Sequence, residues 1–214
     1  MPAAMMTEVQ APDPFAALTV PDVARKVERE VRMEGIPDGA SFADVAYHVW
    51  GGVLEKLEFT KGEHHAYITF LAEDDCTKYF DQTGNGIQWF KDPSIYLDIV
   101  DSDRRIKFGK REQAWLAQGI TRAVGCINIP GNVALEHWLY AARDEKRAVQ
   151  CVWQGQYTNQ SGVQRKTLHA VFTNISDAIK FEAYLKMHDH LSECQLAYGP
   201  DPIAHQTGPP PLLQ

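Results

Sequence analysis

Two short stretches of the chain alternate apolar with polar residues, as half-buried β-strands do. The first spans residues 53–59 (VLEKLEF) and the second spans 63–70 (EHHAYITF), and Lys61-Gly62-Glu63 at their junction predicts a tight hairpin turn. In the second strand, the face predicted to pack in a core carries Ala66, Ile68 and Phe70. The opposite face carries His65, Tyr67 and Thr69.

Helical periodicity accompanies these strands. Residues 41–50 (SFADVAYHVW) carry apolar side chains at i, i+3, i+4 and i+7 spacing, and Ser41 with Asp44 three positions later is a capping-box pattern. A second helix is predicted over 73–83, and further strands over 31–36 and 95–100. The first half of the chain therefore has the element order βαββαβ.

The second half repeats this order. Strands are predicted at 124–129, 148–157, 166–172 and 194–198, and helices at 132–142 and 176–187. Each half therefore predicts a ferredoxin-like α+β domain, a four-stranded antiparallel sheet with two helices on one face. The expected organisation is a flexible N-terminal arm at 1–22, a first domain at 23–110, a helical linker at 111–122, a second domain at 123–200 and a disordered tail at 201–214.

Composition agrees with two folded domains. The 214 residues exceed the usual size of one domain, about 100 to 150 residues, and 44% of them are hydrophobic. No apolar run approaches the roughly 20 residues of a membrane span, and the start of the chain lacks a signal-peptide pattern. Four cysteines without CxxC spacing indicate reduced thiols, so we expect an intracellular protein.

Net charge limits any affinity for nucleic acid. The chain carries −7 overall, and neither half is the basic platform of a tight nonspecific binder. Binding to nucleic acid would therefore depend on local basic residues. In the first half the candidate phosphate contacts are Lys56, Arg104 and Arg105.

Two pairs of segments resemble the motifs of one nucleic-acid-binding family. VRMEGIP (31–37) precedes EHHAYITF (63–70), and VGCINIPG (124–131) precedes KTLHAVF (166–172). Each pair resembles RNP2 and RNP1, the strands of the RNA-recognition motif on which bases stack against aromatic rings. The linker LAQGITRAV and the closing CQLAYGPDP are similar to those of RNA-recognition-motif proteins of filamentous fungi. The resemblance implies a tandem RNA-binding protein, nuclear or cytoplasmic, that acts in post-transcriptional regulation.

The resemblance also implies which side chains meet RNA. In the first domain it places His65 and Tyr67 at the RNP1 stacking positions and Arg32 at that of RNP2. The first sheet should therefore bind short single-stranded RNA, with the three basic residues above as its phosphate contacts. Because stacking contributes about 1–3 kcal/mol per base, one Tyr with weaker helpers predicts micromolar affinity.

The second domain departs further from the family pattern. The same alignment places Gly125, Thr167 and His169 at the stacking positions, so His169 is the candidate RNA contact there. Trp153 is either another stacking ring or a packing residue, and packing is the favoured interpretation. This domain should then orient the first domain or dock a protein.

A protein partner is the alternative to RNA. Gln88-Trp89-Phe90 is similar to an Arg-x-Phe element with which variants of this fold hold a partner's tryptophan, so Trp89 and Phe90 are candidate partner contacts, with Gln where Arg is usual. The few stacking rings and the negative charge also favour a protein-interaction scaffold of this fold with no nucleic-acid role.

Enzyme and metal patterns are missing from the sequence. It has no phosphate loop, nucleophile elbow or Ser/His/Asp arrangement, and Asp98, Asp101 and Asp103 lack the glycine frame and closing Glu of a calcium loop. His64-His65 and the histidine pair at 188–190 lack a third ligand. We therefore expect no enzyme activity, no metal site and no cofactor.

Overall fold

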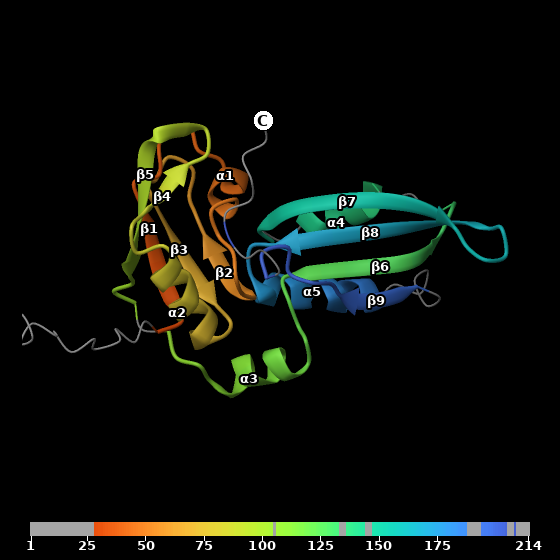
Figure 1. Ribbon diagram of the computed structural model, residues 1–214. Coiled ribbons are helices and arrows are strands. Elements are labelled where there is room, and N and C mark those ends of the chain that lie inside the picture. The colour runs from red at the N-terminus through yellow and green to blue at the C-terminus, as the bar shows by residue number, and fades with distance from the viewer. Residues whose placement is uncertain are drawn as a thin grey trace, which may run out of the picture.

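The computed structural model contains two α+β domains joined by a helical linker (Figure 1). It describes residues 28–104, 106–132, 136–143, 147–187, 194–204 and 208, without the side chain of His137. The predicted arm at 1–22, Arg105 and residues 188–190 lie outside the described residues. The helices within these ranges are all too short or too polar to span a bilayer.

The first domain is built on a five-stranded antiparallel sheet in the order β2-β3-β1-β5-β4. Its elements are β1 (Glu30–Glu34), α1 (Phe42–Ala46), β2 (Leu54–Glu58), β3 (His65–Phe70), α2 (Glu73–Gln82), β4 (Ile87–Trp89) and β5 (Asp92–Asp101). The sequence predicts four strands, and the fifth is β4. Gly86, with φ of +79°, lets the chain turn after α2 and lie close against Leu97 of β5.

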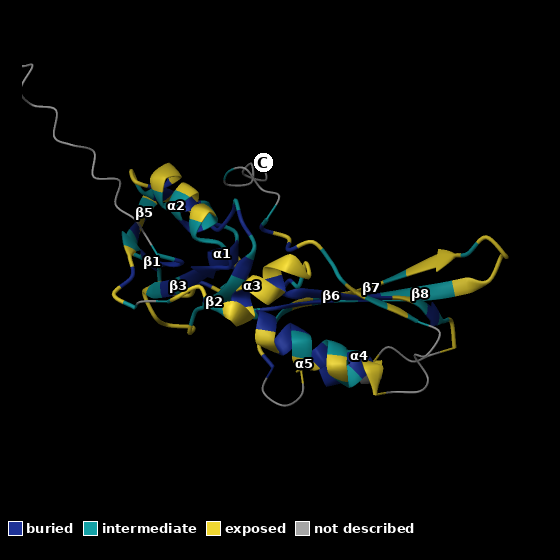
Figure 2. Ribbon diagram, turned by 90° about the horizontal axis from the view of Figure 1, so that it is seen from below, coloured by how far each residue is buried: buried dark blue, intermediate teal, exposed yellow. Residues whose placement is uncertain are grey.

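The second domain has a four-stranded antiparallel sheet in the order β7-β8-β6-β9. Its elements are β6 (Ala123–Pro130), α4 (Glu136–Arg143), β7 (Val149–Thr158), β8 (Gln164–Phe172), α5 (Ile175–Lys186) and β9 (Gln195–Tyr198). Helices α4 and α5 lie on the same side of this sheet (Figure 2). The order matches β2-β3-β1-β5 of the first sheet, so the α+β fold class with two repeated domains is confirmed.

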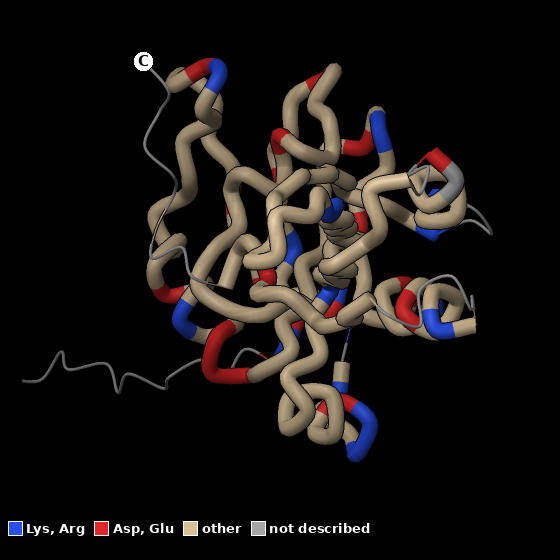
Figure 3. The backbone as a smooth tube through the Cα atoms, turned by 90° about the vertical axis from the view of Figure 1, so that its right-hand side faces the viewer, with Lys and Arg blue, Asp and Glu red and all other residues tan. Residues whose placement is uncertain are grey.

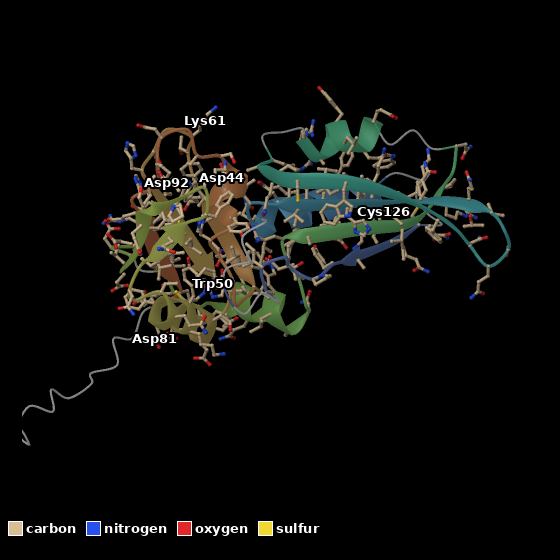
Figure 4. The ribbon with its side chains drawn as sticks, turned by 45° about the horizontal axis from the view of Figure 1, so that its top comes forward. Asp44, Trp50, Lys61, Asp81, Asp92 and Cys126 are labelled. Carbon is tan, nitrogen blue, oxygen red and sulfur yellow. The ribbon has the colours of Figure 1, made fainter. Side chains whose placement is uncertain are left out.

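Each domain has its own core. Trp50 lies in the first core and Cys126 in the second (Figure 4). The predicted core face of β3 is confirmed, because its alternate residues are buried among the helices: Ala66, Ile68 and Phe70. The corresponding residues of β8 are Leu168, Ala170 and Phe172.

A buried arginine precedes the first strand of each domain. Arg29 Nε donates to the Phe70 carbonyl at 3.1 Å, and Arg122 Nη1 donates to the Phe172 carbonyl at 3.1 Å. In return, the N–H of each phenylalanine donates to the carbonyl of its arginine. The two domains thus share an internal anchor as well as a strand order. The carboxylates that pair with these arginines are Glu55 and Asp201, respectively.

The two domains meet along the outer edge of β2. The N–H of Leu57 donates to the Thr173 carbonyl at 2.8 Å, and Lys56 forms an antiparallel bridge with Asn174. These contacts give β2 a backbone partner from the second domain. The linker helix α3 (Lys110–Ala117) lies beside the junction. Its contribution is Trp115, in a small apolar cluster with Leu71 and Ile175.

The segment after β9 corrects a prediction. Residues 201–204 are not a disordered tail, because Asp201 and Ile203 are buried. Asp201 accepts two hydrogen bonds from Arg122, at 2.8 and 2.9 Å, and one from the N–H of Leu54 at 3.3 Å. Ile203 lies in the first core. Leu54 is 147 positions away in the sequence, so the local proline-rich composition gives no sign of this contact.

Candidate nucleic-acid interface

The open face of the first sheet brings three predicted RNA-binding residues together. Arg32 on β1 lies directly opposite Tyr67 on β3, and Glu34 lies opposite His65. The rings of His65 and Tyr67 meet edge-on, with their centroids 5.5 Å apart. Since alternate residues of both strands face the core, these side chains share the face turned away from the helices.

Arg104 covers the ring of Tyr67. Its guanidinium carbon lies 3.5 Å from the ring centroid, which is a stacked cation–π contact. Two carboxylates hold the guanidinium: Arg104 donates to Glu30 at 2.8 Å and to Glu58 at 2.9 Å. Glu30 is buried, so Arg104 is held by a carboxylate that lies within the protein. A base that stacks on this face of Tyr67 would have to displace Arg104.

Two more of the predicted cations, Arg32 and Lys56, are also paired with acids. Arg32 forms an ion pair with Glu34, and Lys56 forms one with Glu58 at 2.6 Å. Burial raises the pKa of Glu58, but hydrogen bonds and charges from Lys56 and Arg104 outweigh burial and hold that pKa below its usual value. The first sheet therefore presents a network of ion pairs in which two of the predicted phosphate contacts, Lys56 and Arg104, have carboxylate partners.

An exposed aromatic pair lies on the second sheet. Trp153 on β7 is directly opposite His169 on β8, and the two rings stack with centroids 5.2 Å apart and an interplanar angle of 12°. The side chain of Trp153 is 46% exposed, so the favoured interpretation of Trp153 as a packing residue is wrong. Because Leu168 and Ala170 on either side of His169 are in the core, the pair lies on the open face.

Gly125 on β6 makes room for this pair. It lies opposite His169 on the side away from Trp153, and a Cβ atom at this position would be 3.2 Å from His169 Nδ1. A side chain at 125 would therefore press on the imidazole. The sequence suggests a missing stacking ring at Gly125, whereas the structure shows that the glycine leaves space for His169.

The strands of the two sheets differ in charge. Those of the second sheet contain no Asp or Glu and two basic residues, Arg165 and Lys166. Arg165 lies opposite Tyr157, and strand alternation places both on the face of Trp153. The first sheet contains two basic strand residues, Arg32 and Lys56. Its acidic strand residues are Glu30, Glu34, Glu55, Glu58, Asp92, Asp98 and Asp101. Figure 3 shows Asp and Glu in red and Lys and Arg in blue along the backbone.

Trp89 and Phe90 belong to the packing of the first domain. Trp89 is 3% exposed and lies in the first core, and Phe90 packs against that core. This burial corrects the prediction that Trp89 contacts a partner. The ring of His48 stacks on Trp89 at a centroid distance of 4.6 Å. His48 Nδ1 donates to the Asp44 carbonyl, Nε2 accepts from the Phe90 N–H, and burial lowers the pKa of His48, so the ring is neutral.

Sequence reasoning left stacking by Trp153 as the less favoured alternative and gave Tyr157 no role. The signal was present in the stretch WQGQY, where aromatic residues and Gly155 alternate with glutamines and so share one face of a strand. Which face this is depends on the register with β8, and alternation alone does not give the register.

No protein-family model and no curated protein matches the sequence. Among solved structures, the chain is similar to RNA recognition domains 1 and 2 of Sex-lethal from Drosophila melanogaster, with 10% identity over 80% of this chain and 100% of that chain and a TM-score of 0.29. It is also similar to the N-terminal three RNA-binding domains of the yeast splicing factor Prp24, with 14% identity, 82% and 68% coverage and a TM-score of 0.29.

A third similar structure is the C-terminal RNA recognition motif of the hypothetical RNA-binding protein RBM19, with 14% identity, 50% and 95% coverage and a TM-score of 0.28. Similarity this low leaves the fold class to rest on the strand orders of the two sheets. It gives no support to the resemblance to a filamentous-fungal subfamily.

Proposed function

We propose that the protein binds short single-stranded RNA, and that the main base-stacking surface is the open face of the second sheet. The observation that carries this proposal is the exposed, stacked pair of Trp153 and His169 on a sheet without acidic strand residues. Unpaired bases stack on such aromatic platforms, at about 1–3 kcal/mol per base. Arg165 on the same face supplies a positive charge for a phosphate.

The first domain has a secondary part in this proposal. A base reaches the covered face of Tyr67 only if Arg104 leaves it, and Arg104 then loses its hydrogen bonds to Glu30 and Glu58. The acids of this sheet also repel phosphate. The predicted stacking residues of the first sheet, Arg32, His65 and Tyr67, therefore form the weaker site. The first domain acts mainly by orienting the second through their shared junction.

Fluorescence anisotropy of a labelled random single-stranded RNA pool over a salt series tests the proposal. Three variants are compared with the wild type: Trp153→Ala, Tyr67→Ala and Tyr140→Ala. Tyr140 is the matched control, because it is 71% exposed on α4, away from both open sheet faces. We expect Trp153→Ala to weaken binding about tenfold, and the other two to change it by less than about twofold.

Two outcomes would contradict the proposal in different ways. Loss of binding in Tyr67→Ala with normal binding in Trp153→Ala would move the site to the first sheet. An absence of salt-sensitive binding by the wild type at tens of micromolar would remove the RNA function. The protein-interaction scaffold would then be the better explanation, with the acidic first sheet as the surface for a basic partner.

A further inference from the structure

The two sheets have four edges, and three of them are protected in recognised ways. Unpaired edge strands invite pairing with another chain, so proteins shorten them, cover them or place charges and prolines on them. Strand β2 is covered by Thr173 and Asn174 of the second domain. Strands β4 and β9 are short, with three and four residues.

The fourth edge, β7, has almost none of these protections. It is ten residues long and contains no charged residue and no proline. Within the described part of the chain it pairs with β8 alone, and the one irregularity lies between Val149 and Cys151. In the repeat, β7 corresponds to β2, whose outer edge the chain itself covers. Among the described residues, the equivalent edge in the second domain is thus long, regular apart from this one irregularity, and uncovered.

The composition of β7 fits a second copy of the same strand. A strand that pairs with itself about a two-fold axis places like residues close together, so charges there would repel. The stretch VQCVWQGQYT has no charge to repel and none to attract a charged partner. If the axis passes through Gln154, Trp153 of each copy lies opposite Gly155 of the other. The indole then covers a position that has no side chain of its own.

We propose that two copies of the protein associate through antiparallel pairing of their β7 strands. The axis is perpendicular to the sheet, so the two four-stranded sheets form one continuous eight-stranded sheet. Both Trp153–His169 pairs then lie on the same face. This inference stands on the edge of β7 and is independent of RNA binding.

The dimer is weak. One pair of strand edges buries less than the roughly 1,600 Å² of a standard protein interface, so association occurs at micromolar concentration and above. Sedimentation equilibrium from about 10 to about 500 µM covers this range. We expect the mass to rise with concentration from the 24.1 kDa of one chain towards twice that value.

Gln154 provides the test, because it is exposed and meets itself across the proposed axis. Gln154→Lys and Gln154→Glu should each raise the dissociation constant about tenfold or more, since like charges then face each other. An equimolar mixture of the two variants should associate again, because Lys then faces Glu. Gln164→Lys is the matched control, an exposed glutamine on the inner strand β8, and should associate like the wild type.

Three results would overturn the proposal. The wild type stays at the mass of one chain throughout the range, in which case β7 is free or serves a strand of another protein. Both Gln154 variants associate as the wild type does, in which case another surface forms the dimer. The mixture of the Lys and Glu variants fails to associate while each variant keeps its fold by circular dichroism, in which case Gln154 does not meet itself.

Discussion

One row of side chains across each sheet shows how the two domains differ. In the first sheet the row is Glu58, Tyr67 and Arg32, on β2, β3 and β1. In the second sheet the corresponding row is Trp153, His169 and Gly125. The backbone order is the same, yet one row is charged around a single ring and the other stacks two rings beside a glycine. A shared fold therefore leaves the binding surface to a few side chains.

The difference lies in what each ring contacts. In the first sheet Arg104 stacks on Tyr67 and is held by carboxylates on both sides, so the ring is already part of an intramolecular contact. In the second sheet His169 stacks on Trp153, and no acidic residue occurs in the strands around them. Ion pairs thus occupy Arg32, Lys56 and Arg104 in the predicted site of the first domain, whereas the second domain keeps an exposed aromatic surface.

The largest expected effect comes from removing the buried arginine of one domain. Arg122→Met should lower the free energy of unfolding by about 3–5 kcal/mol, because Asp201 is then a buried carboxylate without its ion-pair partner. Asp201 also accepts from Leu54, so the change should loosen the junction of the domains. Urea denaturation measures the loss.

Lys186→Met is the control for that change, since it removes the ion pair between the exposed Lys186 and Glu182 on α5. It should cost less than about 0.5 kcal/mol. A loss below about 1 kcal/mol in Arg122→Met would mean that the anchor of the second domain contributes little to stability.

A smaller effect is expected when the cover of Tyr67 is removed. Arg104→Ala takes one donor from buried Glu30, so it should destabilise the protein by about 1–3 kcal/mol. RNA affinity should stay within about twofold of the wild type, because the acids of the first sheet are still present. Anisotropy measures the affinity. A tenfold loss of RNA affinity would instead indicate that Arg104 contacts RNA and that the first sheet is the main binding surface.

Sequence patterns predicted what depends on local order. Strand alternation predicted the core face of β3, and the repeated βαββαβ order of elements predicted a fold of two α+β domains. Contacts between distant residues were not predictable in this way. The stacking of Arg104 on Tyr67 joins a residue of the loop after β5 to a residue of β3. A charged residue on a loop is usually solvated, so the sequence gives no reason to expect this contact.

The same reason explains the two buried arginines and the end of the chain. Arg29 and Arg122 look like surface charges, and only their hydrogen bonds to Phe70, Phe172 and carboxylates show why they are buried. Ile203, amid proline and glycine, gives no periodic signal. Its burial depends on the first domain, which lies far away in the sequence.

Acid should destabilise the first domain, because it protonates the buried ring of His48. Burial lowers the pKa of His48 in the folded protein, whereas the unfolded value is about 6.5. The neutral ring therefore stabilises the fold above pH 6.5, and this contribution is lost as the pH falls below that value. His48→Gln removes the titration, so its unfolding free energy should fall less than that of the wild type from about pH 7.5 to 5.5. Urea denaturation at each pH measures the unfolding free energy. An equal decrease with pH in the wild type and in His48→Gln would contradict this assignment.

The smallest effect expected concerns the glycine in the row of the second sheet. Gly125→Ala places a Cβ atom 3.2 Å from His169 Nδ1, so the imidazole must shift on Trp153 and the stacked platform becomes less regular. RNA affinity should fall about threefold in the anisotropy assay, with little change in thermal stability. Gly199→Ala is the control, because its Cβ would make only an ordinary contact with Ala123 at 3.7 Å. If Gly125→Ala binds RNA as well as Gly199→Ala, the orientation of His169 is not what distinguishes the two sheets, and the exposed ring of Trp153 alone carries the difference.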